Sequence, residues 1–183
     1  MAGYANRTGA MPTDAYRPER ALQLVRAFAG RDRMTPHDAR REVVEMGDGV
    51  APLLMEAMHD HDAQVRWESA KALAELATPN AAGSLVEALE DDDGGVRWVA
   101  AEGLIAIGPP MLDPLLHALL HHSERMWLRE GAHHVLSEVR KRDPEVKAVI
   151  QPVIDGLEGI APRYGVLAPA KRAADALGAH RFQ

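Results

Sequence analysis

An internal repeat is the feature that most constrains this chain. The stretch Asp92–Gly108 reads DDGGVRWVAAEGLIAIG, and the earlier stretch Asp62–Ala77 reads DAQVRWESAKALAELA. A shift of 31 positions superimposes their matching residues, such as Trp67 and Trp98. A further shift of 31 carries Val96 to Trp127 and Ala101 to Ala132, and it predicts a third, weaker copy. Repeats of this length are typical of solenoids, in which each unit buries its apolar face only by stacking on its neighbours.

Each repeat is predicted to hold two antiparallel helices, A and B. Apolar residues four positions apart mark one face of each A helix, and these are Leu54 and Met58, Leu85 and Leu89, and Leu116 and Leu120. Short polar turns follow, where we expect Asp62, Asp93 and either Ser123 or Glu124 to cap the B helix. The chain therefore predicts an all-α fold, an α-α superhelix of about five antiparallel helix pairs.

One domain is expected to hold all of these helices. Residues 1–16 lack helical periodicity and are predicted to form a mobile N-terminal tail. Residues 17–183 form the single repeat domain, with a capping repeat at 17–47, central repeats at 50–142 and a C-terminal repeat at 144–178. In that last repeat we expect an A helix around Val153 and a B helix over 169–178.

The pattern D-x-x-V-R-x-x-A-A-x-x-L-x-x-I-G, present from Asp93 to Gly108, resembles the HEAT-like repeats of the phycobilisome lyase type. The resemblance covers about residues 50 to 136. It implies a right-handed superhelix whose B helices line the concave side. It also implies a ladder of Asp and Arg side chains between successive units, which gives Asp62, Arg66, Asp93 and Arg97 a structural role.

Three groups of proteins share this repeat and have known activities. For each group, we ask whether this chain carries the residues that the activity needs. Deoxyhypusine hydroxylases place the His-Glu pairs that bind iron directly after the Val-Arg pair of certain B helices. This chain carries other pairs at those positions, namely Trp67-Glu68, Trp98-Val99 and Arg129-Glu130, and two indoles and a guanidinium cannot ligate iron. Phycobilin lyases hold a tetrapyrrole, but none of their chemistry-bearing motifs carries over.

The third group, the HEAT-like alkylpurine DNA glycosylases, has a strongly basic concave channel. This chain has 21 basic and 27 acidic residues and a net charge of -6, so it has no broad attraction to phosphates or to an anionic membrane. It has 0 cysteines, which excludes disulfides and thiolate chemistry. The N-terminal stretch has no apolar signal region, and no apolar run approaches the ~20 residues of a membrane span. We expect a soluble, cytoplasmic protein that binds neither nucleic acid nor membrane.

The B helices are predicted to present one row of side chains away from the core. On a helix of ~100 degrees per residue, Trp67 and Lys71 point roughly opposite to the buried face of their B helix. Adjoining repeats bring the equivalent positions together, which predicts a protein-binding strip of Trp67, Lys71, Trp98, Glu102, Ile105, Arg129 and His133. Trp and Arg are enriched at energetic hot spots of interfaces. The alternative is that the indoles pack on one another and stiffen the array. Trp127 replaces Val65 and Val96, so we expect it in the core.

No catalytic, cofactor or metal site is predicted. His117 and His121 share a helical face, but a third ligand is not evident. The carboxylates of Asp91–Asp93 lie on an exposed turn, where nothing raises a pKa for acid-base chemistry. We find no pair of nucleophile and base, no phosphate-binding loop and no cofactor motif, so no cofactor is expected.

The sequence therefore favours a non-enzymatic scaffold or adaptor that binds a helix or peptide of another protein on the concave face of its B helices. The identity of that partner stays open. The alternative is an enzyme or enzyme subunit of the bilin-lyase or metal-hydroxylase kind, which would bind a tetrapyrrole or a metal. Self-association through the terminal repeats is also possible for an open array.

Overall fold

Helices account for the fold, and no strand occurs in the part of the chain that the structure describes, which comprises residues 17–31 and 33–180. The predicted mobile tail, residues 1–16, lies outside this part. The computed structural model contains the helices α1 (Pro18–Ala27), α2 (Pro36–Glu45), α3 (Ala51–Ala57), α4 (Ala63–Leu76), α5 (Ala82–Glu87), α6 (Gly94–Ile107), α7 (Leu112–His121), α8 (Met126–Arg142), α9 (Pro144–Glu158), α10 (Pro162–Gly165) and α11 (Leu167–His180). The all-α prediction is confirmed.

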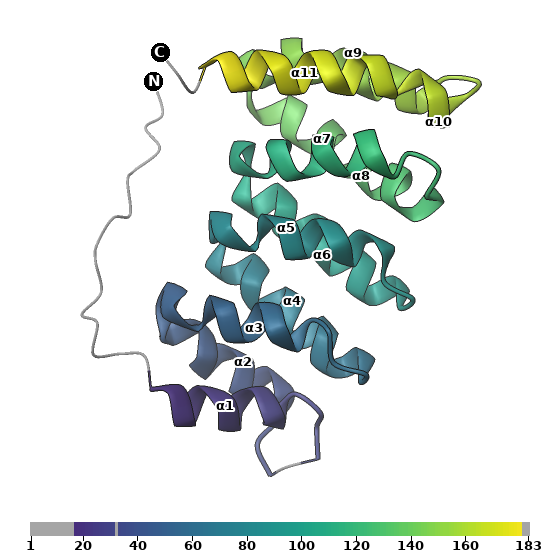
Figure 1. Cartoon of the computed structure of the whole chain (residues 1–183). Helices are drawn as coiled ribbons and strands as arrows, with labels where there is room; N and C mark the ends of the chain where they lie inside the picture. Colours follow the sequence, from purple (N-terminus) through teal and green to yellow (C-terminus); the bar gives the residue numbers. More distant parts are fainter. Residues whose placement is uncertain (1–16, 32, 181–183) are drawn as a thin grey trace.

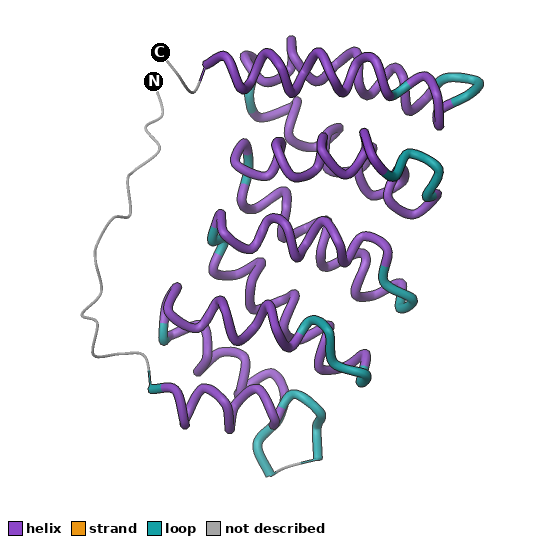
Figure 2. The backbone as a smooth tube through the Cα atoms, viewed as in Figure 1, coloured by secondary structure: helices purple, strands orange, loops and turns teal. Residues whose placement is uncertain are grey.

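The helix pairs stack in sequence order, from α1 at one end of the molecule to α9 and α11 at the other (Figure 1). Helices α2, α4, α6 and α8 pack in sequence order in one layer, the B layer, and α1, α3, α5 and α7 lie in the other, the A layer. Loops and turns are confined to the two edges of the stack, where they connect each helix to the next (Figure 2). This is the expected α-α solenoid. Within the described ranges, no helix is both long enough and apolar enough to cross a membrane.

The last helix pair reverses the expected layers. We expected α9 in the A layer and the segment 169–178 in the B layer, but α9 packs on α8, while α11 packs on α7 and α9. The earlier connections to the A layer run through short 3-10 turns, such as Pro79–Ala81 and Pro109–Met111. Only Asp143 separates α8 from α9, so the chain folds straight back as an antiparallel neighbour of α8.

Small residues allow neighbouring B helices to pack closely. Ala70 and Ala101 are buried in the core that joins the layers. A Cβ atom added to Gly103 of α6 would lie 3.3 Å from the Cβ atom of Ala74 in α4 and 3.0 Å from Leu85 in α5. Any larger side chain at Gly103 would have to displace these neighbours. The core is thus built from aliphatic and small side chains, as the composition indicates.

Aspartates cap the B helices α4 and α6 as predicted. The carboxylate of Asp62 accepts a hydrogen bond from the backbone N–H of Gln64, and that of Asp93 accepts from Gly95 and Val96. Neither Ser123 nor Glu124 caps α8, so this part of the prediction is wrong. Instead, a carboxylate from the preceding repeat, that of Glu90, accepts a hydrogen bond from the backbone N–H of Leu128 in the first turn of α8.

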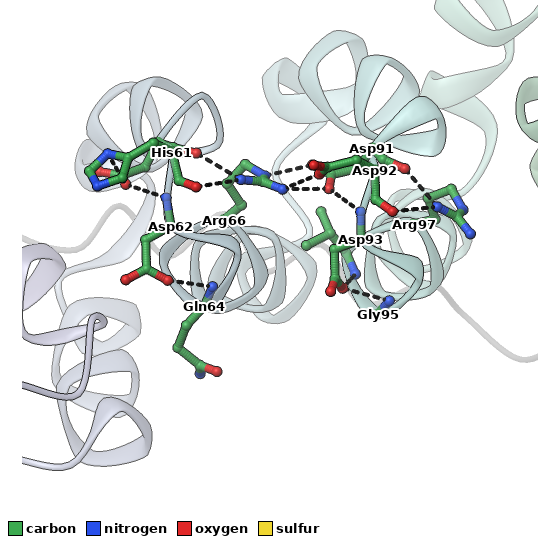
Figure 3. A network of polar contacts seen from close by, with 11 residues as sticks. His61, Asp62, Gln64, Arg66, Asp91, Asp92, Asp93, Gly95 and Arg97 are labelled. Atoms are coloured by element: carbon green, nitrogen blue, oxygen red, sulfur yellow. Dashed lines mark hydrogen bonds and ion pairs between the residues drawn. The ribbon is translucent and has the colours of Figure 1, made fainter.

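A single arginine joins two successive turns at the edge of the stack (Figure 3). The Nη1 group of Arg66 donates to the carbonyl of Asp60 in its own turn, at 2.9 Å. Its Nε and Nη2 groups donate to the two carboxylate oxygens of Asp91 in the next turn, both at 2.8 Å, and Nη2 also pairs with Asp92. Bidentate pairs of this kind are among the strongest side-chain interactions. The ladder implied by the resemblance thus runs from Arg66 to Asp91, because Asp93 is used as a helix cap.

Replacement of this arginine tests its contribution to stability. Arg66→Ala removes a guanidinium that contacts four residues and whose side chain is 11% exposed, and it leaves Asp91 without its counter-charge. We expect the free energy of unfolding to fall by about 2 kcal/mol in urea titrations followed by circular dichroism. The control is Arg31→Ala, since Arg31 pairs with Asp62 at 3.2 Å but its side chain is 75% exposed. A loss below about 1 kcal/mol is expected there, and equal losses for both variants would contradict the assignment.

The same pair predicts how stability depends on pH. Burial by itself raises the pKa of Asp91, but hydrogen bonds from Arg66 and the backbone of Asp93 outweigh it and hold the pKa below its ordinary value of 3.8. A lowered pKa stabilises the fold above the ordinary value, and this contribution is lost as the pH falls through the folded-state value. The stability advantage of wild type over Asp91→Asn should therefore shrink below about pH 4 in acid titrations of unfolding. In an Arg66→Ala background the same comparison should lose most of its pH dependence.

Candidate interaction surface

The B layer presents the predicted strip only in part. Trp98 of α6 is 59% exposed, and Lys71 and Glu102 are half-buried. Ile105 was expected to face outward, but it is buried. The reason is that α6 lies between α4 and α8 in the same layer, which leaves only a narrow arc of its surface uncovered. Ile105 is therefore not a residue of this surface.

Trp67 packs between repeats. The guanidinium carbon of Arg40 in α2 lies 5.7 Å from the centre of its ring. On the side of α6, a Cβ atom added to Gly95 would lie only 3.3 Å from Cδ1 of Trp67. Arg40 is itself held by a buried ion pair with Glu68 and by Glu75, whose Oε1 lies 3.0 Å from its Nε. The absence of a side chain at Gly95 thus lets the indole lie against the start of the next B helix.

The spacing between equivalent arginines grows by one residue in the third repeat. In each repeat an arginine donates from Nη1 to a turn carbonyl six positions earlier: Arg66 to Asp60 at 2.9 Å, Arg97 to Asp91 at 2.7 Å and Arg129 to Ser123 at 2.7 Å. The third arginine follows the second by 32 positions, because 129 − 97 = 32. Arg129 is thus the counterpart of Arg66 and Arg97, and its predicted place beside Trp67 and Trp98 is wrong.

This shift exchanges the roles of two neighbouring residues in α8. Leu128 is buried and occupies the core position predicted for Trp127. Trp127 is 42% exposed, so the prediction that it belongs to the core is wrong. It stands at the position of Gly95 in the repeat before, since 127 − 95 = 32. Its ring lies under the guanidinium of Arg97, at 4.1 Å from the centre of the ring.

The two exposed tryptophans line one hollow between α6 and α8. Trp98 has no glycine to lie against, because Trp127 replaces it, and its indole stacks on His134 with the ring centres 5.1 Å apart. The hollow has a volume of about 360 Å³. Apolar or small residues form most of its lining, namely Leu89, Gly94, Ala101, Gly131, Trp98 and Trp127. The polar residues of the lining are Arg97, Glu130 and His134. We call this space the tryptophan hollow.

Other predicted residues lie around a second hollow, between α8 and the end of α9. Arg129 and His133 line it together with Met126, and its volume is about 450 Å³. His133 faces Glu158 of α9, with Nε2 2.8 Å from a carboxylate oxygen. Glu130 lines both hollows, so the two lie on either side of α8.

The remaining predicted residues lie at the margins. Glu102 lies 3.4 Å from Nε2 of His134, whose ring stacks on Trp98. Lys71 lies on α4, outside the lining of both hollows. The structure therefore brings Trp98 and Glu102 together, places Arg129 and His133 on the other side of α8, and separates both groups from Trp67.

Of the residues that line the tryptophan hollow, the sequence predicted only Trp98 for the binding strip. The polar and aromatic residues missing from that prediction are Arg97, Trp127, Glu130 and His134. A signal for the correct register was present. An apolar residue followed by arginine recurs as Val65-Arg66, Val96-Arg97 and Leu128-Arg129. Aligning the third repeat on this pair, in place of a constant shift of 31, gives the spacing of 32 that the structure adopts.

Two histidines of α7 lie close together. The rings of His117 and His121 lie 4.3 Å apart on the exposed side of α7. Among residues 17–31 and 33–180, no three side chains of His, Asp or Glu gather in a way that could hold a metal ion.

Comparison with known proteins identifies the repeat type over part of the chain. Residues 23–105 match the family profile of HEAT repeats. No curated protein matches the chain. One similar solved structure is that of an engineered protein from the Northeast Structural Genomics Consortium, with 20% sequence identity. The match covers 87% of this chain and 72% of the engineered chain, with a TM-score of 0.39.

Stability measurements can separate the packed tryptophan from the exposed one. Trp67→Ala removes an indole that fills the space between Arg40 and Gly95, so we expect a loss of about 2 kcal/mol in the free energy of unfolding. Trp98→Ala removes a side chain that is 59% exposed and should change stability by less than about 1 kcal/mol. Urea titration of both variants tests this, and a larger loss for Trp98→Ala would contradict the assignment.

Proposed function

We propose that this protein is a non-enzymatic scaffold that binds a helix or an extended peptide of a partner protein across the B layer. HEAT repeats generally mediate interactions between proteins, and residues 23–105 match them. The observation that carries the proposal is the pair of exposed indoles, Trp98 and Trp127, beside a hollow of about 360 Å³. Large apolar groups gathered on a surface mark interaction sites.

The shape of this surface favours an elongated ligand. The tryptophan hollow and the hollow of about 450 Å³ lie on either side of α8 and share Glu130. Neighbouring helices are about 8–10 Å apart, a distance that a helix spans in two turns and a strand in three residues. Two anchor side chains of one peptide could therefore enter both hollows at once.

The structure suggests different roles for the residues of the predicted strip. We propose Trp98 and Trp127 as the main anchors, because indoles contribute large contact areas at a small entropy cost. Glu102 lies next to Trp98 through His134, and His133 lines the hollow on the other side of α8, so these two would add polar selectivity at different hollows. Trp67 would mainly stiffen the stack, and Lys71 would contact only a ligand that extends toward α4. We further propose that the repeats belong to the phycobilisome-lyase type, on the pattern from Asp93 to Gly108, and that the protein acts in the cytoplasm.

Affinity capture from native cell extract tests the proposal. Wild-type protein should retain a partner that Trp98→Ala loses, because the variant removes the anchor and not the fold. The control is Tyr164→Ala, since Tyr164 is an equally exposed aromatic residue (68%) in α10, outside both hollows. This variant should retain the partner. Circular dichroism confirms that all three proteins are folded.

Two outcomes would count against the proposal. If Trp98→Ala retains the same partner as wild type, the tryptophan hollow is not the binding site. If the purified protein carries a stoichiometric tetrapyrrole or metal, seen by absorption spectroscopy and metal analysis, the alternative of an enzyme subunit replaces the scaffold.

A further inference from the structure

The ladder of arginines at the edge of the stack provides a reference for what such a guanidinium binds. Arg66 uses its two sides differently: Nη1 donates to carbonyls of its own turn, while Nε and Nη2 donate to the carboxylate of Asp91 in the next repeat. The carboxylate belongs to the position that begins the next turn. We call one arginine with its turn carbonyls and the carboxylate of the next repeat a rung. The rung of Arg66 is complete, because Nε and Nη2 both hold the carboxylate of Asp91.

The next rung lacks this carboxylate. Arg97 repeats the inner contacts, with Nη1 donating to the carbonyls of Asp91 at 2.7 Å and Asp92 at 3.2 Å. With the spacing of 32, Ser123 occupies the position of Asp91, and Glu124 that of Asp92. Ser123 is buried, and the carboxylate of Glu124 lies beside Arg125 at 3.9 Å.

No carboxylate within the described ranges lies within 4.0 Å of the Arg97 guanidinium. Figure 3 shows the contrast, with Arg66 bonded on both sides and Arg97 bonded only toward Asp91 and Asp92.

Arg97 is held in place beside the tryptophan hollow. Its guanidinium lies over Trp127, 4.1 Å from the ring centre, and it lines the hollow together with Trp98. Stacking on an aromatic ring and binding to turn carbonyls restrict the side chain before any ligand arrives, so little entropy is lost when its remaining N–H groups bind. The apolar floor of the hollow, with Leu89 and Ala101, lies next to this fixed cation.

We propose that a carboxylate of the partner completes this rung by binding Arg97, while an adjacent apolar side chain of the same segment fills the tryptophan hollow. This inference rests on the proposed function and specifies the chemistry of the partner: an Asp, a Glu or a C-terminal carboxylate next to a bulky apolar residue. Glu130 lines the same hollow and repels a second acid. The site therefore selects a segment with one acidic group at Arg97, and a polyacidic segment is disfavoured.

Selection from a random peptide library displayed on phage tests the proposal on the full chain. Peptides enriched on wild type should carry an acidic residue or a free C-terminal carboxylate beside a bulky apolar residue. Selection on Arg97→Gln should lose the acid preference and keep the apolar one. If wild type enriches peptides without any acid preference and Trp98→Ala does not retain them, the role of Arg97 is wrong while the scaffold proposal stands. If wild type enriches nothing beyond Trp98→Ala, both fail.

Affinities of one selected peptide make the test quantitative, with tryptophan fluorescence as the readout. Replacing its acid by the matching amide should weaken binding to wild type by about 10-fold to 100-fold. Arg97→Gln should lower the affinity for the acidic peptide by a similar factor and change the affinity for the amide peptide by less than about 2-fold. This difference would show that Arg97 and the acid of the peptide are directly coupled. Equal weakening of both peptides would overturn the proposal.

Two further variants serve as controls. Arg97→Lys keeps the charge but loses the planar fork, so its affinity for the acidic peptide should fall between those of wild type and Arg97→Gln. Glu130→Gln removes the repelling carboxylate and should raise the affinity for the acidic peptide more than the affinity for the amide peptide. Weaker binding of the acidic peptide to Glu130→Gln would contradict the placement of the carboxylate beside Arg97.

Discussion

The hydrogen bond from an arginine to a turn carbonyl six positions earlier sets the register of each B helix in this stack. Arg66, Arg97 and Arg129 all make it, at 2.7 to 2.9 Å. This bond ties the first turn of each B helix to the turn before it, and the arginines follow one another by 31 and then by 32 positions. The extra residue therefore precedes Ser123 and moves the whole of α8 by one position. Every side chain of α8 then occupies a different place from the one that a constant repeat length would give it.

The properties of the candidate surface follow from that one residue. In the regular repeat, Gly95 leaves room for Trp67, which becomes part of the packing. In the longer repeat, Trp127 stands where the glycine would be, so Trp98 stays exposed and a hollow lies between the two indoles. The same change puts Ser123 where an aspartate would pair with Arg97. Irregularity in the array thus concentrates exposed aromatic groups and an incompletely paired cation at a single repeat interface.

Sequence reasoning was accurate wherever local patterns determine the structure. Helical periodicity and the caps at Asp62 and Asp93 predicted the helices and their solenoid arrangement, because these signals act within one or two turns. It failed for Trp127 and Ile105, whose exposure depends on the neighbouring helices. It also failed for the layers of α9 and α11, because a linker of one residue, Asp143, decided which neighbour α9 would meet.

The sequence by itself determined that this chain is an all-α array with an aliphatic core, since period, apolar spacing and turn residues are properties of the chain alone. Only the tertiary structure decided which tryptophan is packed and which is exposed, because exposure is set by what the adjacent repeat places opposite each indole. It also decided that Arg97, and not Arg129, is the guanidinium beside the tryptophan hollow. The physical reason is that side chains at a repeat interface come from segments about 30 residues apart, so their partners depend on a register that one additional residue can change.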